Sequence, residues 1–217
     1  MTVLAFRTSA DVATAVPTAV DHLKNSGLIA HPTETVYGLG SRANESDLAA
    51  LADLKGRASS KPFLLLIADL EMAADFGLTF TPAARALAHR FWPGPVTLVL
   101  NGGEGRLPDT LRGPEGGIAV RWTSHGPTAS LIGRLQAPMS STSANIPGAR
   151  TAPGVEALLE MFGKAVDSGQ LMLLDGGVLG NVPPSTLIDC TRPTPRLIRE
   201  GAIPLTELRA GVGRFAP

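Results

Sequence analysis

The chain has a single cysteine, Cys190, among its 217 residues. One cysteine excludes an internal disulfide framework, and it favours a reducing compartment in which the thiol is a small buried core side chain. The formal net charge is zero, because 19 Lys and Arg residues balance 19 Asp and Glu residues. The overall field therefore does not attract nucleic acid or anionic membranes, and any phosphate binding must come from a local cluster of cations.

Long apolar runs are absent as well, and none approaches the length of a membrane-spanning helix. The first residues, 1–7, do not lead from a basic stretch into an apolar one, so we expect a cytoplasmic protein that makes no contact with a membrane. Aromatic residues make up only 5% of the chain, and only one of them is a tyrosine. This scarcity argues against a surface that stacks nucleobases.

Several catalytic signatures are missing too. No set of His, Cys, Asp and Glu has metal-ligand spacing, and neither a Gly-x-Ser-x-Gly elbow nor a Walker-type loop occurs. The segment 38–43 loosely matches a dinucleotide fingerprint, but the acidic residue expected after the next strand is absent. We therefore predict no metal site built by the protein, and neither serine hydrolase nor P-loop chemistry.

A hydrophobic content of 44% is enough to bury a sizeable core. We expect one domain over residues 1–208, followed by a short C-terminal tail over residues 209–217. Apolar spacing predicts helices over residues 11–25, 46–56, 82–91, 128–135 and 155–162. It predicts strands over residues 28–31, 63–67, 96–100, 118–121, 137–140, 171–174, 186–189 and 196–198. Ser9 and Ser46 are expected to cap the first two helices. Alternating helices and buried strands indicate an α/β fold.

The densest polar segment covers residues 31–40. Its hydroxyls can donate hydrogen bonds to an amino acid or a phosphate, and Glu34 can take up an ammonium group or help to hold a metal. The two glycines at its end allow the backbone to approach a ligand closely. The alternative is a turn whose Thr and Glu side chains bond their own backbone.

Two further polar clusters are each ambiguous. Lys55, Arg57 and Lys61 could clamp a triphosphate, or could simply be cations placed favourably at a helix C-terminus. The hydroxyls and carboxamide of 141–145 could contact a nucleotide or form an Asx or Ser/Thr turn.

Two arginines, Arg121 and Arg199, each lie at the end of a predicted strand. An arginine in this position suits a carboxylate or a phosphate. Stacking of Arg121 on its neighbour, or a surface ion pair of Arg199 with Asp189 or Glu200, would also explain them.

Seven short motifs occur in a fixed order between residues 32 and 201. They are Pro32-Thr33-Glu34-Thr35-Val36-Tyr37-Gly38-Leu39-Gly40, Lys55-Gly56-Arg57 with Lys61-Pro62, Trp92-Pro93-Gly94-Pro95-Val96-Thr97-Leu98, Val120-Arg121, Thr142-Ser143-Ala144-Asn145 with Gly148, Pro184-Ser185-Thr186, and Ile198-Arg199-Glu200-Gly201. In this order they resemble the YrdC-like family of L-threonylcarbamoyladenylate synthases, in its short, single-domain form.

The resemblance implies a twisted α/β sheet of mixed parallel and antiparallel strands, with flanking helices around an open, locally positive cavity. It also implies an activity in which L-threonine, bicarbonate and ATP give L-threonylcarbamoyl-AMP and pyrophosphate. A downstream transferase complex would use the product to make N6-threonylcarbamoyladenosine in tRNA. Mg²⁺ would arrive with ATP rather than in a protein cage.

The resemblance also assigns roles to individual residues. Those expected to bind ATP are Lys55, Arg57, Lys61, Ser141, Ser143, Asn145 and Arg199, and catalysis would rest on Lys55 and Arg57. Those expected on the threonine side are Thr33, Arg121, Thr142 and Ser185. Three positions depart from the family pattern: Ala58 and Thr123 replace a usual proline, and Pro147 replaces a usual serine or threonine.

Two other functions stay open at this point. The first is an RNA-binding protein that uses the positive cavity for a phosphate backbone, with weak binding of tRNA as its mildest form. The second is a paralogue that acts on a different carbamoyl adenylate.

Overall fold

The computed structural model describes residues 2–56, 62–212 and 214–216. Its helices are α1 (Ser9–Lys24), α2 (Glu45–Lys55), α3 (Leu70–Asp75), α4 (Pro82–Phe91), α5 (Gly126–Leu135), α6 (Val155–Asp167) and α7 (Leu205–Val212), with a 3-10 turn at Asp109–Leu111. Its strands are β1 (Val3–Ala5), β2 (Leu28–His31), β3 (Gly38–Gly40), β4 (Leu64–Ile67), β5 (Leu78–Thr79), β6 (Val96–Gly102), β7 (Ile118–Trp122), β8 (Met139–Ser143), β9 (Leu171–Asp175), β10 (Thr186–Asp189) and β11 (Arg196–Arg199).

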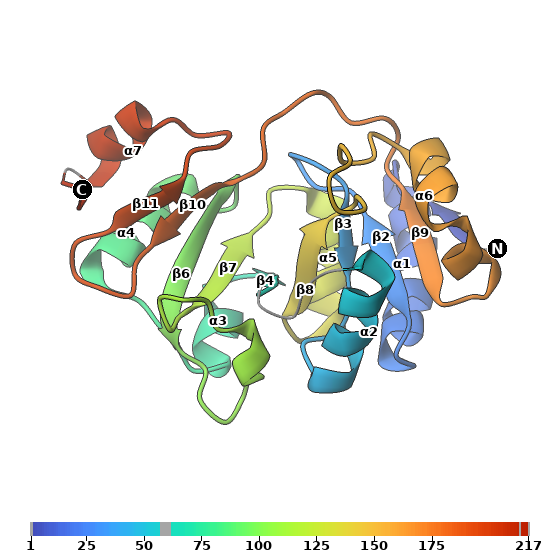
Figure 1. The fold of residues 1–217 in the computed structure, drawn as a ribbon, viewed down its shortest axis with the longest axis horizontal. Coiled ribbons are helices and arrows are strands. Elements are labelled where there is room, and N and C mark those ends of the chain that lie inside the picture. The colour runs from blue at the N-terminus through green and yellow to red at the C-terminus, as the bar shows by residue number, and fades with distance from the viewer. Residues whose placement is uncertain (1, 57–61, 213, 217) are drawn as a thin grey trace.

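Within the described residues all strands belong to one twisted sheet in the order β1-β9-β2-β3-β8-β4-β7-β6-β10-β11, and β5 pairs with β6 (Figure 1). The pairing is mixed: β2 runs parallel to β9, whereas β3 and β8 are antiparallel neighbours. The predicted fold class, an α/β fold with a mixed sheet and flanking helices, is therefore confirmed. Figure 1 also shows that the connection from β9 to β10 crosses from one end of the sheet to the other.

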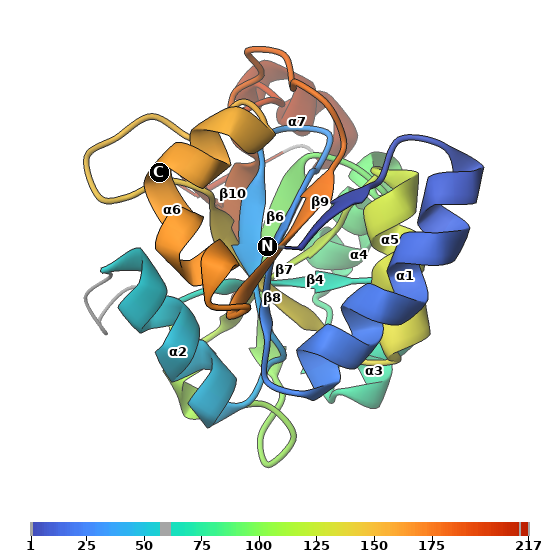
Figure 2. The ribbon, with the colours of Figure 1, turned by 90° about the vertical axis from the view of Figure 1, so that its right-hand side faces the viewer.

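Helices cover both faces of the sheet, and the apolar cluster is larger on one face than on the other. Figure 2 shows α1 and α5 on one side of the sheet and α2 and α6 on the other. Under α1 and α5 lies an apolar cluster that includes Val16, Leu131 and, from β4, Leu66. A larger cluster occupies the opposite face, where α2, α4 and α6 contribute Leu51, Leu87 and Leu158. No helix among the described residues is long and apolar enough to cross a bilayer.

Both predicted caps are wrong by one or two positions. Thr8, not Ser9, caps α1, because its hydroxyl accepts from the Asp11 backbone N–H while the Asp11 carboxylate accepts from the Thr8 N–H. Asn44, not Ser46, caps α2, since its side chain reaches the Asp47 N–H at 2.9 Å. In each case a polar residue one or two positions earlier has the extended backbone that a cap requires.

In two segments the regular secondary structure extends further along the chain than predicted. Strand β8 does not end at Ser140 but continues to Ser143, because β3 and β4 pair with its two edges and satisfy the backbone of this polar stretch. Near the C-terminus, the domain boundary expected at residue 208 falls inside α7, where Leu208 is fully buried in the core.

Candidate functional site

A cavity of about 540 Å³ opens on the same face of the sheet as α1 and α5. Side chains of a strand alternate between faces, so every second residue of neighbouring strands lines one surface. The residues that follow this alternation in the cavity wall are Leu64 and Leu66 of β4, Thr97 and Val99 of β6, Ala119 and Arg121 of β7, and Ser141 and Ser143 of β8. All the described residues that line the cavity come from strands and loops.

The structure brings most of the predicted site residues together in this cavity. Those that line it are Thr33, Arg121, Ser141, Thr142, Ser143, Ser185 and Arg199. The loops after β2 and β9 and the ends of β7 and β11 thus converge with β8 on one space, although their sequences are far apart. The cavity wall is apolar between these polar groups, as in many small-molecule sites.

Arg121 is the most deeply buried arginine of the cavity wall among the described residues. Only 4% of it is exposed, and its Nη2 lies 2.8 Å from Glu34 Oε1 and 3.2 Å from Thr35 Oγ1. Burial raises the pKa of Glu34, but the charge of Arg121 and hydrogen bonds from Thr123 and Arg121 outweigh burial, so this pKa lies below its usual value. Glu34 therefore binds Arg121, rather than a ligand ammonium or a metal.

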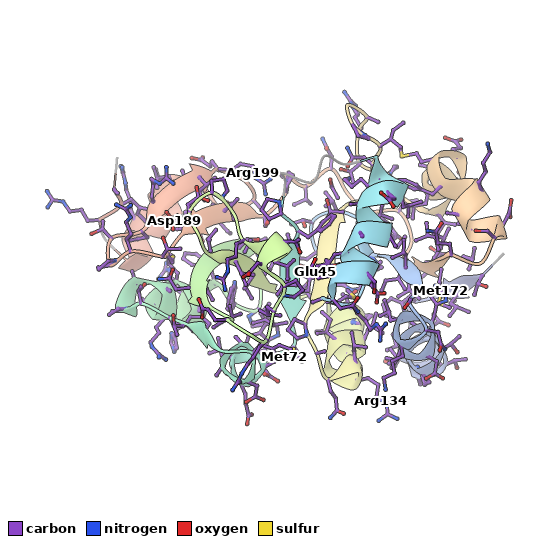
Figure 3. All side chains as sticks on the ribbon, turned by 60° about the horizontal axis from the view of Figure 1, so that its bottom comes forward. Glu45, Met72, Arg134, Met172, Asp189 and Arg199 are labelled. Carbon is purple, nitrogen blue, oxygen red and sulfur yellow. The ribbon has the colours of Figure 1, made fainter. Side chains whose placement is uncertain are left out.

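Arg199 differs from Arg121 in its surroundings. It lies at the end of β11, on the side of the molecule formed by β10 and β11 (Figure 3), and its Nη2 donates to the Ser185 carbonyl at 2.8 Å. Partial burial and the nearby charge of Arg121 lower the pKa of Arg199. Asp189, an ion-pair partner expected as an alternative, is paired with Arg196 instead. Arg199 thus supplies positive charge to the cavity.

Hydroxyl groups complete the cavity wall, and several of them also bond to the protein. Ser185 Oγ lies 2.8 Å from Thr97 Oγ1, and Ser143 Oγ donates to Asn145 Oδ1 at 2.7 Å. The Thr33 hydroxyl donates to the Val36 carbonyl and accepts from two backbone N–H groups of its own loop. The threonine part of the turn expected as the alternative is therefore present in the cavity wall, whereas the Glu34 side chain binds Arg121 and Thr123.

Lys55 and Asn145 are not among the described residues that line the cavity. The Lys55 ammonium is buried and donates to the carbonyl oxygens of Ser143 and Asn145 and to Asn145 Oδ1. The Asn145 amide in turn donates to the carbonyls of Ile146 and Ala149. Lys55 therefore ties the end of α2 to the loop after β8. The predicted phosphate ligands Arg57 and Lys61, together with Ala58, lie outside the described residues.

The glycines of the first motif are required by the packing of the sheet. A Cβ at Gly38 would lie 2.7 Å from Ser141 Oγ and 2.8 Å from His31 Nε2, and one at Gly40 would lie 2.7 Å from the Ser140 carbonyl oxygen. These glycines let β3 pack against β8 and β2. Gly38 also lines the cavity, so the close approach of its backbone to a ligand stays a prediction.

Sequence reasoning missed several residues of the site. Thr97, Glu115 and Thr151 line the cavity, and Glu115 is bonded to Arg196 at 3.0 Å. The sequence marks His31 only as the start of a polar segment, yet its Nε2 contacts Ser141. Strand alternation would have identified Thr97, which is two residues before Val99 in a continuous run. Glu115 and Thr151 sit in loops whose path the sequence does not fix.

The described residues contain no group of three or more His, Cys, Asp and Glu side chains that could hold a metal ion. The carboxylate that lines the cavity, Glu115, is paired with Arg196.

Comparisons with known proteins match the chain to one family. The pattern of the Sua5, YciO and YrdC family, described as "Telomere recombination", matches residues 21–201. A Threonylcarbamoyl-AMP synthase of Pyrococcus abyssi is 34% identical over 198 residues, which are 91% of this chain and 57% of that protein. One from Thiobacillus denitrificans is 38% identical over 169 residues, 77% of this chain and 87% of that protein.

A solved structure from the same family has the same fold. The crystal structure of P. abyssi Sua5 complexed with L-threonine is 32% identical, with a TM-score of 0.88 over 99% of this chain and 62% of that chain. The chain therefore spans little more than half the length of the Pyrococcus relative, and its similarity covers the domain that contains the cavity.

Proposed function

Since the chain belongs to the Sua5, YciO and YrdC family, we propose that it is an enzyme that converts L-threonine, bicarbonate and ATP into L-threonylcarbamoyl-AMP and pyrophosphate. One observation carries the proposal: Arg121, Arg199 and a row of hydroxyls converge in one cavity. The name of the P. abyssi and T. denitrificans relatives, Threonylcarbamoyl-AMP synthase, supports it. So does the L-threonine complex of P. abyssi Sua5.

The chemistry asks for alignment and for cations more than for a protein nucleophile. The α-amine of threonine attacks the carbon of bicarbonate and, with loss of water, gives a carbamate. A carbamate oxygen then attacks the α-phosphate of ATP and expels pyrophosphate. Both steps are accelerated by holding the reactants in line and by neutralising the charge that develops on the phosphates.

We assign the two ends of the cavity by charge. Arg121, held by Glu34, suits the carboxylate of threonine, with Thr33, Thr142 and Ser185 beside it. Arg199, Ser141 and Ser143 suit the nucleotide, and the same proposal gives Arg57 and Lys61 the phosphates. Lys55 and Asn145 would support the nucleotide side through the loop that they hold together.

Mg²⁺ fits this proposal as a companion of ATP. The Glu115 carboxylate of the cavity wall is already paired with Arg196, so the phosphate oxygens would be the principal ligands of the metal. Mg²⁺ would shield the triphosphate charge, while the arginines orient it. Under this proposal the product passes to a tRNA threonylcarbamoyl transferase complex, and the protein acts in the cytoplasm.

The test is a direct assay of the purified protein with ATP, bicarbonate and radiolabelled L-threonine. We expect L-threonylcarbamoyl-AMP and pyrophosphate in equal amounts. Absence of product with threonine, or equal turnover of every amino acid, would overturn the proposal. Arg57→Ala should abolish product without unfolding the protein, whereas the matched control Arg134→Ala, in the exposed last turn of α5, should retain it.

The same preparation separates the two other functions. An RNA-binding protein would bind tRNA tightly and form no adenylate. No aromatic residue is among the described residues that line the cavity, so base stacking has no platform there. A paralogue that makes a different carbamoyl adenylate would release pyrophosphate from ATP only when another amine or carbamate replaces L-threonine.

A further inference from the structure

Thr123 lies just beyond the end of β7 and is not among the described residues that line the cavity. It is only 1% exposed, so its hydroxyl must find partners inside the protein. The hydroxyl donates to Glu34 Oε2 and accepts from the His125 backbone N–H at 3.2 Å. It therefore joins the loop before α5 to the loop after β2.

Glu34 is held at both of its oxygens. Oε2 accepts from Thr123, and Oε1 accepts from the Ser124 backbone N–H at 3.3 Å and from Arg121 Nη2 at 2.8 Å. A glutamate side chain has several rotatable bonds, so a single ion pair would leave its orientation loose. The additional contacts from Thr123 and Ser124 fix the direction of the carboxylate.

Arg121 is held through Nη2. This nitrogen contacts Glu34 and Thr35, whereas Nε is buried and has no hydrogen-bond partner among the described residues. A guanidinium is planar, so fixing one nitrogen in two directions fixes the orientation of the whole fork. The Glu34 carboxylate and Thr35 Oγ1 therefore orient Arg121, and the Thr123 hydroxyl, with the Ser124 N–H, fixes the position of that carboxylate.

We propose that Thr123 is a positioning residue that, through Glu34, holds the Arg121 guanidinium in the orientation that receives a substrate carboxylate. This inference rests on the proposed function for the identity of the carboxylate, which is that of L-threonine. The position suits the role, because a β-branched side chain has few rotamers and the adjacent helix cap at His125 fixes the backbone.

Three variants test the proposal. Thr123→Val keeps the shape and removes the hydroxyl, and Thr123→Ser restores the hydroxyl. Thr128→Val is the matched control, because Thr128 is equally buried near the start of α5 and its hydroxyl contacts the same helix cap, His125 Nδ1, but donates to the Pro32 carbonyl instead of to Glu34. Calorimetry measures L-threonine affinity, steady-state kinetics measure KM for ATP, and ¹⁵N NMR of the arginine side chains follows Arg121 without any ligand.

We expect Thr123→Val to raise the dissociation constant for L-threonine about tenfold, the effect of losing one hydrogen bond to a charged group. Thr123→Ser and Thr128→Val should stay within about twofold of the wild type, and KM for ATP should not change in any variant. In ligand-free protein, the Arg121 guanidinium signals, assigned by their loss in Arg121→Lys, should show hindered rotation that disappears in Thr123→Val.

Unchanged threonine affinity together with unchanged Arg121 rotation in Thr123→Val would overturn the proposal. Equal losses in Thr123→Val and Thr128→Val would also overturn it, since the effect would then be structural. If Thr123→Val does not fold, Glu34→Gln must abolish the hindered rotation, and its persistence would be equally fatal. A wild-type protein that does not bind L-threonine would refute the proposed function, and the NMR signal would then decide the positioning role alone.

Discussion

His31 Nε2 lies 3.3 Å from Ser141 Oγ, so a fully buried imidazole contacts a hydroxyl of the cavity wall. Burial lowers the pKa of His31 to about 4, and the charges of His125 and Arg121 act in the same direction. The imidazole is therefore neutral at pH 7. With Nδ1 3.4 Å from the Pro32 carbonyl, the proton belongs on Nδ1, so Nε2 accepts from Ser141. The Ser141 hydroxyl can then accept hydrogen bonds from a ligand but has no proton left to donate to it.

This burial makes stability depend on pH in a defined direction. In the unfolded chain His31 has its ordinary pKa of 6.5, so between pH 6.5 and about 4 the unfolded chain binds a proton that the folded chain excludes. The free energy of unfolding should therefore fall on acidification through this window, by on the order of 3 kcal/mol. Urea unfolding at about pH 4.5 and about pH 7 measures the loss.

The control for this pH dependence is His31→Asn, which keeps a hydrogen-bonding side chain but cannot titrate. We expect the variant to lose clearly less stability than the wild type between the two pH values. His125, whose pKa burial also lowers, is present in both proteins and cancels in the comparison. Identical losses would show that His31 does not carry the effect.

A second prediction concerns Lys55. Lys55→Met keeps the length of the side chain but removes the donor that the oxygens of Ser143 and Asn145 share. We expect the free energy of unfolding to fall by about 1–3 kcal/mol, the penalty for unsatisfied buried polar groups. The control is Lys24→Met, because Lys24 is also the last residue of its helix but is exposed. Equal stabilities of the two variants in urea would contradict the anchoring role of Lys55.

Many helices and strands could be predicted from the sequence because they are encoded locally, whereas the mixed strand pairing came from the family resemblance and the short elements β1, β3, β5, α3 and α7 were not predicted. Continuous apolar runs, such as those within β4 and β6, indicate buried strands, and the spacing of small and apolar residues indicates α1 and α5. Strand alternation also explains why Arg121 and Ser141 face one cavity. The site could be predicted only in part, because its geometry depends on contacts between distant segments. Glu34 joins Arg121 and Thr123 from a loop far away in the sequence, and no local pattern specifies such a contact.

A third prediction concerns the packing of β3. Gly40→Ala places a methyl group 2.7 Å from the Ser140 carbonyl oxygen, which is backbone and cannot rotate away. We expect the free energy of unfolding to fall by about 1–3 kcal/mol, as in other overpacked cores. Gly133→Ala is the matched control, since Gly133 lies in α5 with its nearest atom 3.8 Å away, and it should gain about 0.5–1 kcal/mol. Thermal and urea unfolding would show the opposite signs, and a stable Gly40→Ala protein would refute the packing argument.

The last prediction separates the two arginines of the cavity. Arg121 is buried and paired with Glu34, whereas Arg199 is only partly buried and, among the described residues, has no carboxylate within ion-pair distance. A charge of this kind adds little to the stability of the fold, but it attracts an anion across the cavity. Arg199→Gln keeps a donor for the Ser185 carbonyl and removes the charge. The free energy of unfolding should therefore change by no more than about 0.5 kcal/mol.

Ligand binding should respond very differently. Under the proposed function, Arg199→Gln should raise KM for ATP about tenfold or more, because a charge-assisted contact to the nucleotide phosphates is lost. The threonine affinity should stay close to that of the wild type, since Arg121 and Glu34 are unchanged. The wild-type KM for ATP should also rise with ionic strength, and this salt dependence should weaken in the variant. Arg209→Gln, an exposed arginine of α7, serves as the control. If Arg199→Gln raised KM for threonine and left KM for ATP unchanged, Arg199 would belong to the carboxylate end of the cavity, and the division of the site by charge would be wrong.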